Sequence, residues 1–165
     1  MEPCRSLALL AGCLGLTSSL IALSTDYWIV ATDSKFSAHS GLWPKSQGIQ
    51  VAGYIHVTQS LYILAALWGL VSVGLLVLSC IPSLSTPGRG PLVSTVMAFT
   101  AALFIIVATA VYTSKRWSQT PTPQVQIFFS WSFYLGWASS IFFLCAGCLS
   151  LGAHCRTRRA EYETL

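Results

Sequence analysis

Residues 7–25 read LALLAGCLGLTSSLIALST, a run without one charged side chain. Three more such runs follow, over Leu61–Ile81, Leu92–Thr113 and Phe128–Ala153, and every Lys, Arg, Asp, Glu and His lies outside the runs. A helix needs about 20 apolar residues to cross a bilayer, and each run is close to or above that length. The sequence therefore predicts a membrane protein of all-α class, a bundle of four transmembrane helices.

The composition leaves little room for a separate soluble domain. Of 165 residues, 54% are hydrophobic and 8% are charged, whereas soluble domains average about 25% charged residues. The net charge of +4 is small and scattered, so it gives no indication of nucleic-acid binding. We therefore treat residues 1–165 as one membrane domain.

The first run also occupies the position of a secretory signal peptide. It is longer than a typical signal core, and no clear small-x-small cleavage site follows it. An uncleaved signal anchor is the favoured interpretation, and cleavage is the alternative.

The polar segments indicate which side of the membrane each faces. They are a short N-terminus, a first loop 26–60, a connector 82–91, a second loop 114–127 and a tail 154–165. The N-terminus, connector and tail carry five Arg, and the two loops carry four Lys or Arg. This bias favours cytosolic termini. The six cysteines agree, because all lie outside the two loops and free thiols belong in a reducing compartment.

The first loop contains two segments with the composition of β-strands, Tyr27–Val30 and Ile49–Val57. Both are rich in β-branched and aromatic residues, and Ser40-Gly41 and residues 44–48 supply turn residues between them. We expect a small antiparallel sheet on the outer side. The prolines of the connector and of Thr120–Pro123 predict tight, irregular turns.

Small residues recur at four-residue spacing on every run: Ala11, Gly15 and Ser19; Ala65 and Gly69; Ala98 and Ala102; Gly136 and Ser140. Such stripes let helix backbones approach closely in lipid. We expect the stripes to face one another inside a single bundle. A homo-oligomer formed through an outward-facing stripe is the alternative.

Two short motifs in the first loop connect the chain with a known superfamily. Trp28 closely follows the first run, and Gly41-Leu42-Trp43 comes later in the loop. With its span order, long first loop and short second loop, the chain resembles the peripheral myelin protein, epithelial membrane protein and claudin superfamily. The resemblance implies a claudin-like fold. Because indole rings favour the water–lipid interface, we expect Trp28 and Trp43 to lie there and to anchor the outer sheet against the ends of the helices.

The chain departs from the claudin pattern at one point. Claudins carry two cysteines after Gly-Leu-Trp that form a disulfide, and this loop has no cysteine. Claudin-like adhesion is therefore disfavoured, and strand pairing and the two tryptophans must hold the sheet.

Within this superfamily the chain is very similar, over nearly its full length, to a branch found in the granules of cytotoxic lymphocytes. The similarity includes Ser37–Pro44, Gly53–Gln59, Phe128–Trp137 and Tyr162–Leu165. It implies a non-enzymatic protein of cytolytic granules, which are lysosome-related, that promotes granule exocytosis and killing through protein partners. It would reach the plasma membrane when granules fuse. A claudin-like adhesion or barrier protein and a regulatory subunit of a channel or proton pump are the alternatives.

The tail ends in Tyr162-Glu163-Thr164-Leu165. A tyrosine followed three residues later by a bulky apolar residue is typical of lysosomal sorting signals that clathrin adaptors bind as extended peptides. We therefore expect Tyr162 and Leu165 to enter two adaptor pockets.

Cys4 and Cys155 lie beside Arg5 and Arg156 at the predicted membrane edge. Cysteines in this setting are candidates for palmitoylation, and unmodified thiols are the alternative.

The runs lack the intramembrane acids, bases and histidines that transporters and pumps use. No nucleophile–base set or cluster of metal ligands is apparent either. The sequence thus indicates no enzyme, no cofactor and no metal. The expected partners are membrane lipids, a clathrin adaptor and other granule or plasma-membrane proteins.

Overall fold

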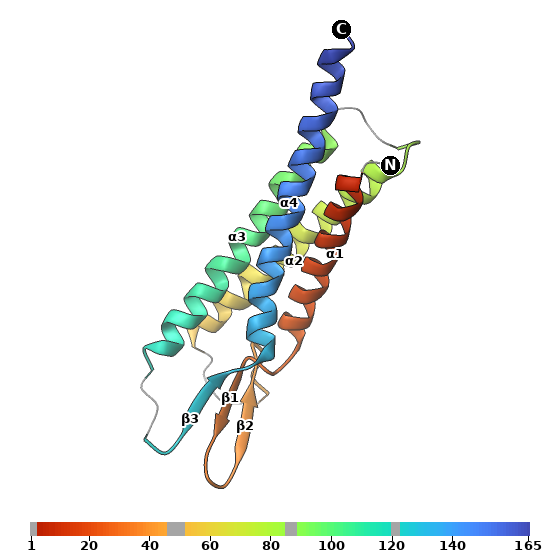
Figure 1. Ribbon diagram of the computed structural model, residues 1–165. Coiled ribbons are helices and arrows are strands. Elements are labelled where there is room, and N and C mark those ends of the chain that lie inside the picture. The colour runs from red at the N-terminus through yellow and green to blue at the C-terminus, as the bar shows by residue number, and fades with distance from the viewer. Residues whose placement is uncertain (1–2, 46–51, 85–88, 120–122) are drawn as a thin grey trace.

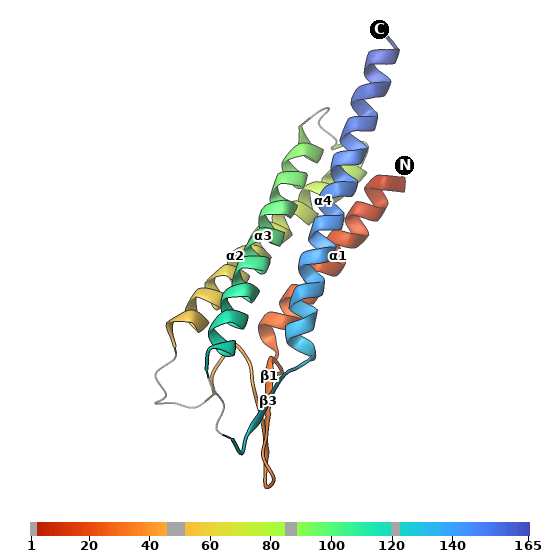
Figure 2. The ribbon, with the colours of Figure 1, turned by 60° about the vertical axis from the view of Figure 1, so that its left-hand side comes forward.

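The computed structural model describes residues 3–45, 52–84, 89–119 and 123–165. Within these ranges the elements are α1 (Pro3–Ser24), β1 (Ile29–Thr32), β2 (Ser37–Ser40), α2 (Gly53–Cys80), α3 (Gly90–Trp117), β3 (Gln126–Phe129) and α4 (Trp131–Glu163). All four helices are long and apolar enough to cross a membrane. They form an elongated bundle with both termini at one end and the strands at the other (Figure 1, Figure 2). We call these the tail end and the sheet end.

The sheet has the strand order β2-β1-β3, and both pairings are antiparallel. Ile29 of β1 is paired with Ser40 of β2 on one side and with Phe129 of β3 on the other. The predicted small antiparallel sheet is confirmed, but its third strand comes from the second loop. Phe128, expected to begin the fourth helix, lies in β3 instead, and α4 begins at Trp131.

The predicted strand Ile49–Val57 is wrong where the structure describes it. Residues from Gly53 onward form the first turns of α2, so this helix begins well before Leu61; residues 49–51 lie outside the described ranges. The Thr58 hydroxyl, one turn beyond Tyr54, approaches the Ala108 carbonyl of α3 at 3.5 Å. A short β-branched segment does not distinguish strand from helix by periodicity, and packing against α3 favours the helix here.

The small-residue stripes face the bundle interior, which confirms their predicted role. Each named position is buried: Ala11, Gly15, Ser19, Ala65, Gly69, Ala98, Ala102, Gly136 and Ser140. A Cβ at Gly69 would lie 2.5 Å from the Phe143 ring of α4, and one at Gly136 would overlap the Tyr62 hydroxyl of α2. These glycines thus make room for large side chains of neighbouring helices, as close packing in lipid requires.

Hydroxyl groups inside the bundle bind one another or backbone carbonyls. Ser72 of α2 and Ser94 of α3 donate reciprocally to each other's carbonyl oxygens at 2.9 and 3.0 Å. Nearer the sheet end, the Tyr62 hydroxyl lies 2.9 Å from that of Thr109. Such pairing satisfies polar groups that would be costly to leave unbonded away from water.

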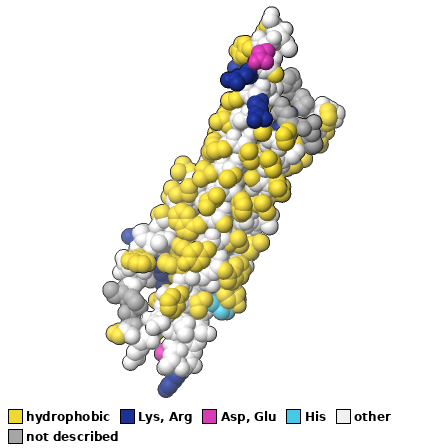
Figure 3. Space-filling model, in the orientation of Figure 1, with side chains coloured by type: hydrophobic (Ala, Val, Ile, Leu, Met, Phe, Trp, Pro, Cys, Tyr) yellow, Lys and Arg dark blue, Asp and Glu magenta, His cyan; other side chains and the backbone are white. Residues whose placement is uncertain are grey.

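The surface is divided along the length of the bundle. Hydrophobic side chains cover the middle of the face seen in Figure 3, and Lys and Arg side chains lie toward its two ends. This is the pattern of a bundle with an apolar belt in the membrane.

Most of the tail 154–165 is helical, because α4 continues through Glu163. The helix therefore projects beyond Ala153, where the apolar run ends, by ten residues (154–163), which is roughly 15 Å of helix. Only Thr164 and Leu165 lie beyond it.

Candidate functional site

The two loop tryptophans bind consecutive carbonyls in the last turn of α1. Trp28 Nε1 donates to the Ala22 oxygen at 2.6 Å, and Trp43 Nε1 donates to the Leu23 oxygen at 2.8 Å. The last four carbonyls of a helix lack partners within it. The motif tryptophans thus cap the C-terminus of α1 and fix the loop to it.

Trp28 does not lie at the water–lipid interface, where the sequence placed it. Its side chain is 0% exposed, inside the bundle, with edge-to-face contacts to Tyr62 at 5.4 Å and Tyr112 at 5.0 Å between ring centroids. Trp43 is 45% exposed and remains at the surface. Trp28 is therefore the centre of an aromatic cluster that joins β1 to α2, α3 and α4.

Gly41 and Leu42 have distinct roles in the loop. A Cβ at Gly41 would lie 2.6 Å from both the Asp26 Cα and the Thr25 carbonyl oxygen, so this backbone contact requires glycine. Leu42 is buried, and its carbonyl accepts a hydrogen bond from Gln59 Nε2 of α2 at 2.5 Å. The Gly-Leu-Trp motif therefore ties the loop to both α1 and α2. The six cysteines are free, so these contacts hold the loop without a disulfide.

An ion pair and a hydroxyl pair complete the junction of α1 with its neighbours. Lys45 Nζ lies 2.5 Å from Asp26 Oδ2, and the hydrogen bond to this carboxylate, followed by its charge, raises the pKa of Lys45. The Thr25 hydroxyl lies 2.7 Å from that of Ser132 at the start of α4. Sequence reasoning missed Gln59, Thr25 and Ser132, because their partners are distant in the chain.

An apolar groove opens between α3 and α4 at the sheet end. It is lined by Trp117, Phe129, Phe133 and Trp137 among others, and Trp117 is 80% exposed. Aromatic residues at this level of a membrane protein form the usual interfacial belt, so the groove needs no ligand to account for it.

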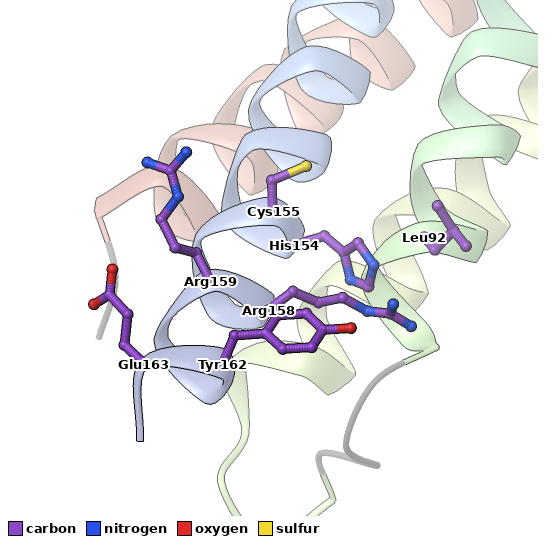
Figure 4. Close-up of a pocket in the computed structure, with 7 residues that line it drawn as sticks. All are labelled: Leu92, His154, Cys155, Arg158, Arg159, Tyr162 and Glu163. Atoms are coloured by element: carbon purple, nitrogen blue, oxygen red, sulfur yellow. The ribbon is translucent and has the colours of Figure 1, made fainter. Parts of the chain in front are cut away.

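The tail end carries a different kind of surface. A cleft between the α4 extension and the first turn of α3 is lined by Leu92, His154, Cys155, Arg158, Arg159, Tyr162 and Glu163 (Figure 4). Tyr162 is 71% exposed, and Leu165 is fully exposed. Two residues of the predicted sorting motif are thus accessible, but Tyr162 is held in helical backbone.

Arg5 connects three helices at this end. Its guanidinium donates to the Ser79 carbonyl of α2 at 3.4 Å and to the Thr157 hydroxyl of α4 at 3.5 Å. Of the two candidate palmitoylation sites, Cys4 is half-buried and Cys155 is exposed in the cleft. Their lipidation stays a prediction.

Comparison with known proteins places this geometry in a family. Residues 5–150 match the profile of the PMP-22/EMP/MP20/Claudin family. The chain belongs to this family. It is 82% identical to Protein NKG7 of Mus musculus and 65% identical to Protein NKG7 of Homo sapiens, each over the whole length of both chains. It is 30% identical over 144 residues to Claudin domain-containing protein 2 of Mus musculus, which covers 81% of this chain and 78% of that one.

Family membership confirms the resemblance drawn from Trp28 and Gly41-Leu42-Trp43, and the protein is a tetraspan membrane protein with a claudin-like fold. The family match ends at residue 150. The extension of α4, and the residues by which it lines the cleft, therefore lie beyond the part that the family profile describes.

Proposed function

We propose that this family member is a non-enzymatic membrane protein of cytotoxic lymphocyte granules. It promotes granule exocytosis, and thereby the killing of target cells, through protein partners. The observation that carries the proposal is the full-length similarity to the proteins named NKG7, at 82% and 65% identity. A granule role is what the resemblance of the sequence to that branch of the family implies.

The chemistry of the bundle supports a role through partners rather than through transport. The four apolar runs contain no charged residue or histidine, and such groups are what pumps and transporters use inside the membrane. The hydroxyls of Ser72, Ser94 and Tyr62 are engaged in contacts between helices. The surfaces left for recognition are the sheet end, the tail end and the lipid-facing sides.

We also propose that the tail end is cytosolic and that Tyr162 and Leu165 direct the protein to granules. Adaptor binding requires an extended peptide, so the last turn of α4 must unwind first. Support comes from the position of that turn. Among the described residues, the Thr164 hydroxyl bonds only to Ala160 and Glu161 of the same helix, and helix ends fray readily.

Removal of the protein from cytotoxic lymphocytes tests the granule role. We expect less granule-membrane marker at the cell surface after target contact, and less target lysis, with the number of granules per cell unchanged. Re-expression of the full chain restores both. Undiminished marker exposure in cells that lack the protein would contradict the proposal.

Tyr162→Ala tests the sorting signal separately. We expect the steady-state protein to move from granules to the plasma membrane, measured by surface labelling and by microscopy against a granule marker. The matched control is Tyr134→Ala, which alters a tyrosine of similar exposure (61%) at the sheet end of α4. The sorting claim fails if the Tyr162 and Tyr134 variants are distributed alike.

A further inference from the structure

The cleft at the tail end combines basic side chains with an apolar floor at the level of the membrane surface. Figure 4 shows His154, Arg158 and Tyr162 extending from α4 toward Leu92 of α3, while Arg159 and Glu163 extend from the opposite side of the helix. Within the described residues, no carboxylate lies within 4 Å of Arg158. The cleft is therefore lined by two arginines and one glutamate, which leaves it net positive, and Arg158 makes no ion pair among the described residues.

The height of the cleft matches the headgroup layer of a bilayer. Arg158 lies five residues beyond Ala153, the end of the apolar run, which is a rise of roughly 7 to 8 Å. The headgroup layer on each side of the hydrocarbon core is roughly 5 to 8 Å thick. By this measure His154 lies at the inner edge of the layer and Arg158 at its outer edge. Tyr162, nine residues beyond Ala153, lies roughly 13 Å along the helix and therefore outside the layer.

The opposite wall of the cleft adds to the positive potential. Leu92 belongs to the first turn of α3, which begins at Gly90 after Arg89. The Ser150 hydroxyl donates to the Pro91 carbonyl at 3.0 Å and so fixes this turn against α4. Helix N-termini carry partial positive charge, and this one lies on the same side as Arg158. Leu92, which is 44% exposed, leaves an apolar surface below it for an acyl chain.

We infer that the cleft binds the phosphorylated headgroup of an anionic phospholipid in the adjoining leaflet, of the phosphoinositide class. Arg158 donates two parallel hydrogen bonds to the phosphate monoester, the geometry in which guanidinium binds phosphate most strongly. His154 and the Tyr162 hydroxyl are placed to donate beside it. Basic pockets between helices at this depth are suited to such headgroups. The inference does not depend on the granule role, but it rests on the proposed cytosolic placement of the tail end, because phosphoinositides belong to the cytosolic leaflet.

The test uses the purified full-length protein in phosphatidylcholine micelles, titrated with a fluorescent phosphatidylinositol bisphosphate and followed by anisotropy. Arg158→Gln removes the fork of donors, and we expect binding to weaken about ten-fold or more, as for a hydrogen bond to a charged group. Arg158 is exposed beyond the apolar run, so this variant should fold. Size-exclusion chromatography checks that it does.

Arg156→Gln is the matched control. Arg156 carries the same charge as Arg158 and lies two residues before it, but its side chain does not line the cleft. Diffuse attraction to an anionic surface contributes about five-fold per basic residue wherever it lies. We expect the Arg156 variant to lose no more than this. Equal losses for the two variants would overturn the inference.

Two further arms identify the ligand. Phosphatidylserine at matched total charge should compete at least ten-fold less well than the phosphoinositide, and equal competition would overturn a phosphate-specific site. Soluble inositol phosphate should compete weakly, because it lacks the acyl chain that Leu92 contacts. Competition as strong as that of the lipid would assign the cleft to a free phosphate and overturn the lipid assignment.

Discussion

The sheet end and the tail end of this bundle are built on opposite principles. At the sheet end, Trp28 and Leu42 are fully buried, and the loop is fastened to helix ends by indole and amide hydrogen bonds. At the tail end, α4 extends past its neighbours, and Arg158 and Tyr162 remain exposed. The motif that identifies the family serves the fold, while the exposed basic and aromatic side chains of the tail end lie beyond the residues that match the family profile.

The difference teaches how to read a family motif in this class of protein. Trp28, Gly41 and Trp43 contact the backbone of α1 or its continuation, so their presence indicates how the loop is attached rather than what it binds. Variants at the two ends should accordingly separate loss of stability from loss of function.

The largest expected effect is that of Trp28→Ala. It empties the centre of the aromatic cluster and leaves the Ala22 carbonyl without its donor. We expect the free energy of unfolding to fall by about 3–5 kcal/mol, measured by denaturant titration in mixed micelles. Trp117→Ala is the control, since this indole is 80% exposed and its loss should cost far less. If the two substitutions lower the free energy of unfolding by similar amounts, Trp28 is not distinguished from a surface tryptophan by its place in the core.

Gly41→Ala should have the next largest effect. The added methyl would overlap backbone atoms of Thr25 and Asp26, which must shift to admit it. We expect a cost of about 1–3 kcal/mol in unfolding free energy, typical of overpacking. Gly53→Ala is the matched control, because a Cβ there meets nothing within 4 Å. If Gly41→Ala is as stable as the control, the close approach of the two backbones is not required.

A smaller, pH-dependent effect is expected from the ion pair of Lys45 with Asp26. Because the pKa of Lys45 is raised in the folded state above its ordinary 10.5, its contribution is complete below that pH and is lost as pH rises through the folded-state value. Lys45→Met should therefore lower Tm slightly at pH 8 and not at all above the folded-state pKa, where the lysine is neutral. High salt should also reduce the difference. A Tm difference that persists at high pH would mean that the lysine acts through packing; Lys35→Met controls for loss of a loop charge.

The smallest effect on stability is expected at the tail end. Tyr162→Ala should leave the free energy of unfolding within about 0.5 kcal/mol of the parent protein, as exposed substitutions do, although we expect it to redistribute the protein in cells. Circular dichroism and denaturant titration provide the check. A cost near that of Gly41→Ala would show that the α4 extension is part of the folded core, and the contrast between the ends would then fail.

Much of the fold could be predicted from residue patterns. The uncharged runs identified four helices, and the small-residue stripes identified their inward faces. The outer sheet was expected, but its pairing was not. Ile55 and Val57 are residue types that favour strands, but they lie in α2. The residue pattern assigns Ile127 to the second loop and Phe128 to the fourth helix, but both lie in β3. Strand partners are set by contacts between distant segments, which local composition does not encode.

The candidate sites were predictable to different degrees. Trp28 and Gly41-Leu42-Trp43 were recognisable as a motif, but the burial of Trp28 depends on the space that Tyr62, Tyr112 and Phe133 leave between three helices. Tyr162 was recognisable as part of a candidate sorting motif, but its helical state was not predictable, because nothing in the tail sequence specifies where α4 stops.

The sequence by itself determined that this protein spans the membrane four times and carries no charge inside it. Whether a segment can cross a bilayer depends on its own length and its own lack of charged residues, and both can be read without knowing its neighbours. The tertiary structure decided that Trp28 anchors the loop from inside the core, that the sheet draws its third strand from the second loop, and that Arg158 faces Leu92 across a cleft. These depend on which helices lie beside one another, and that is settled by packing between segments far apart in the chain.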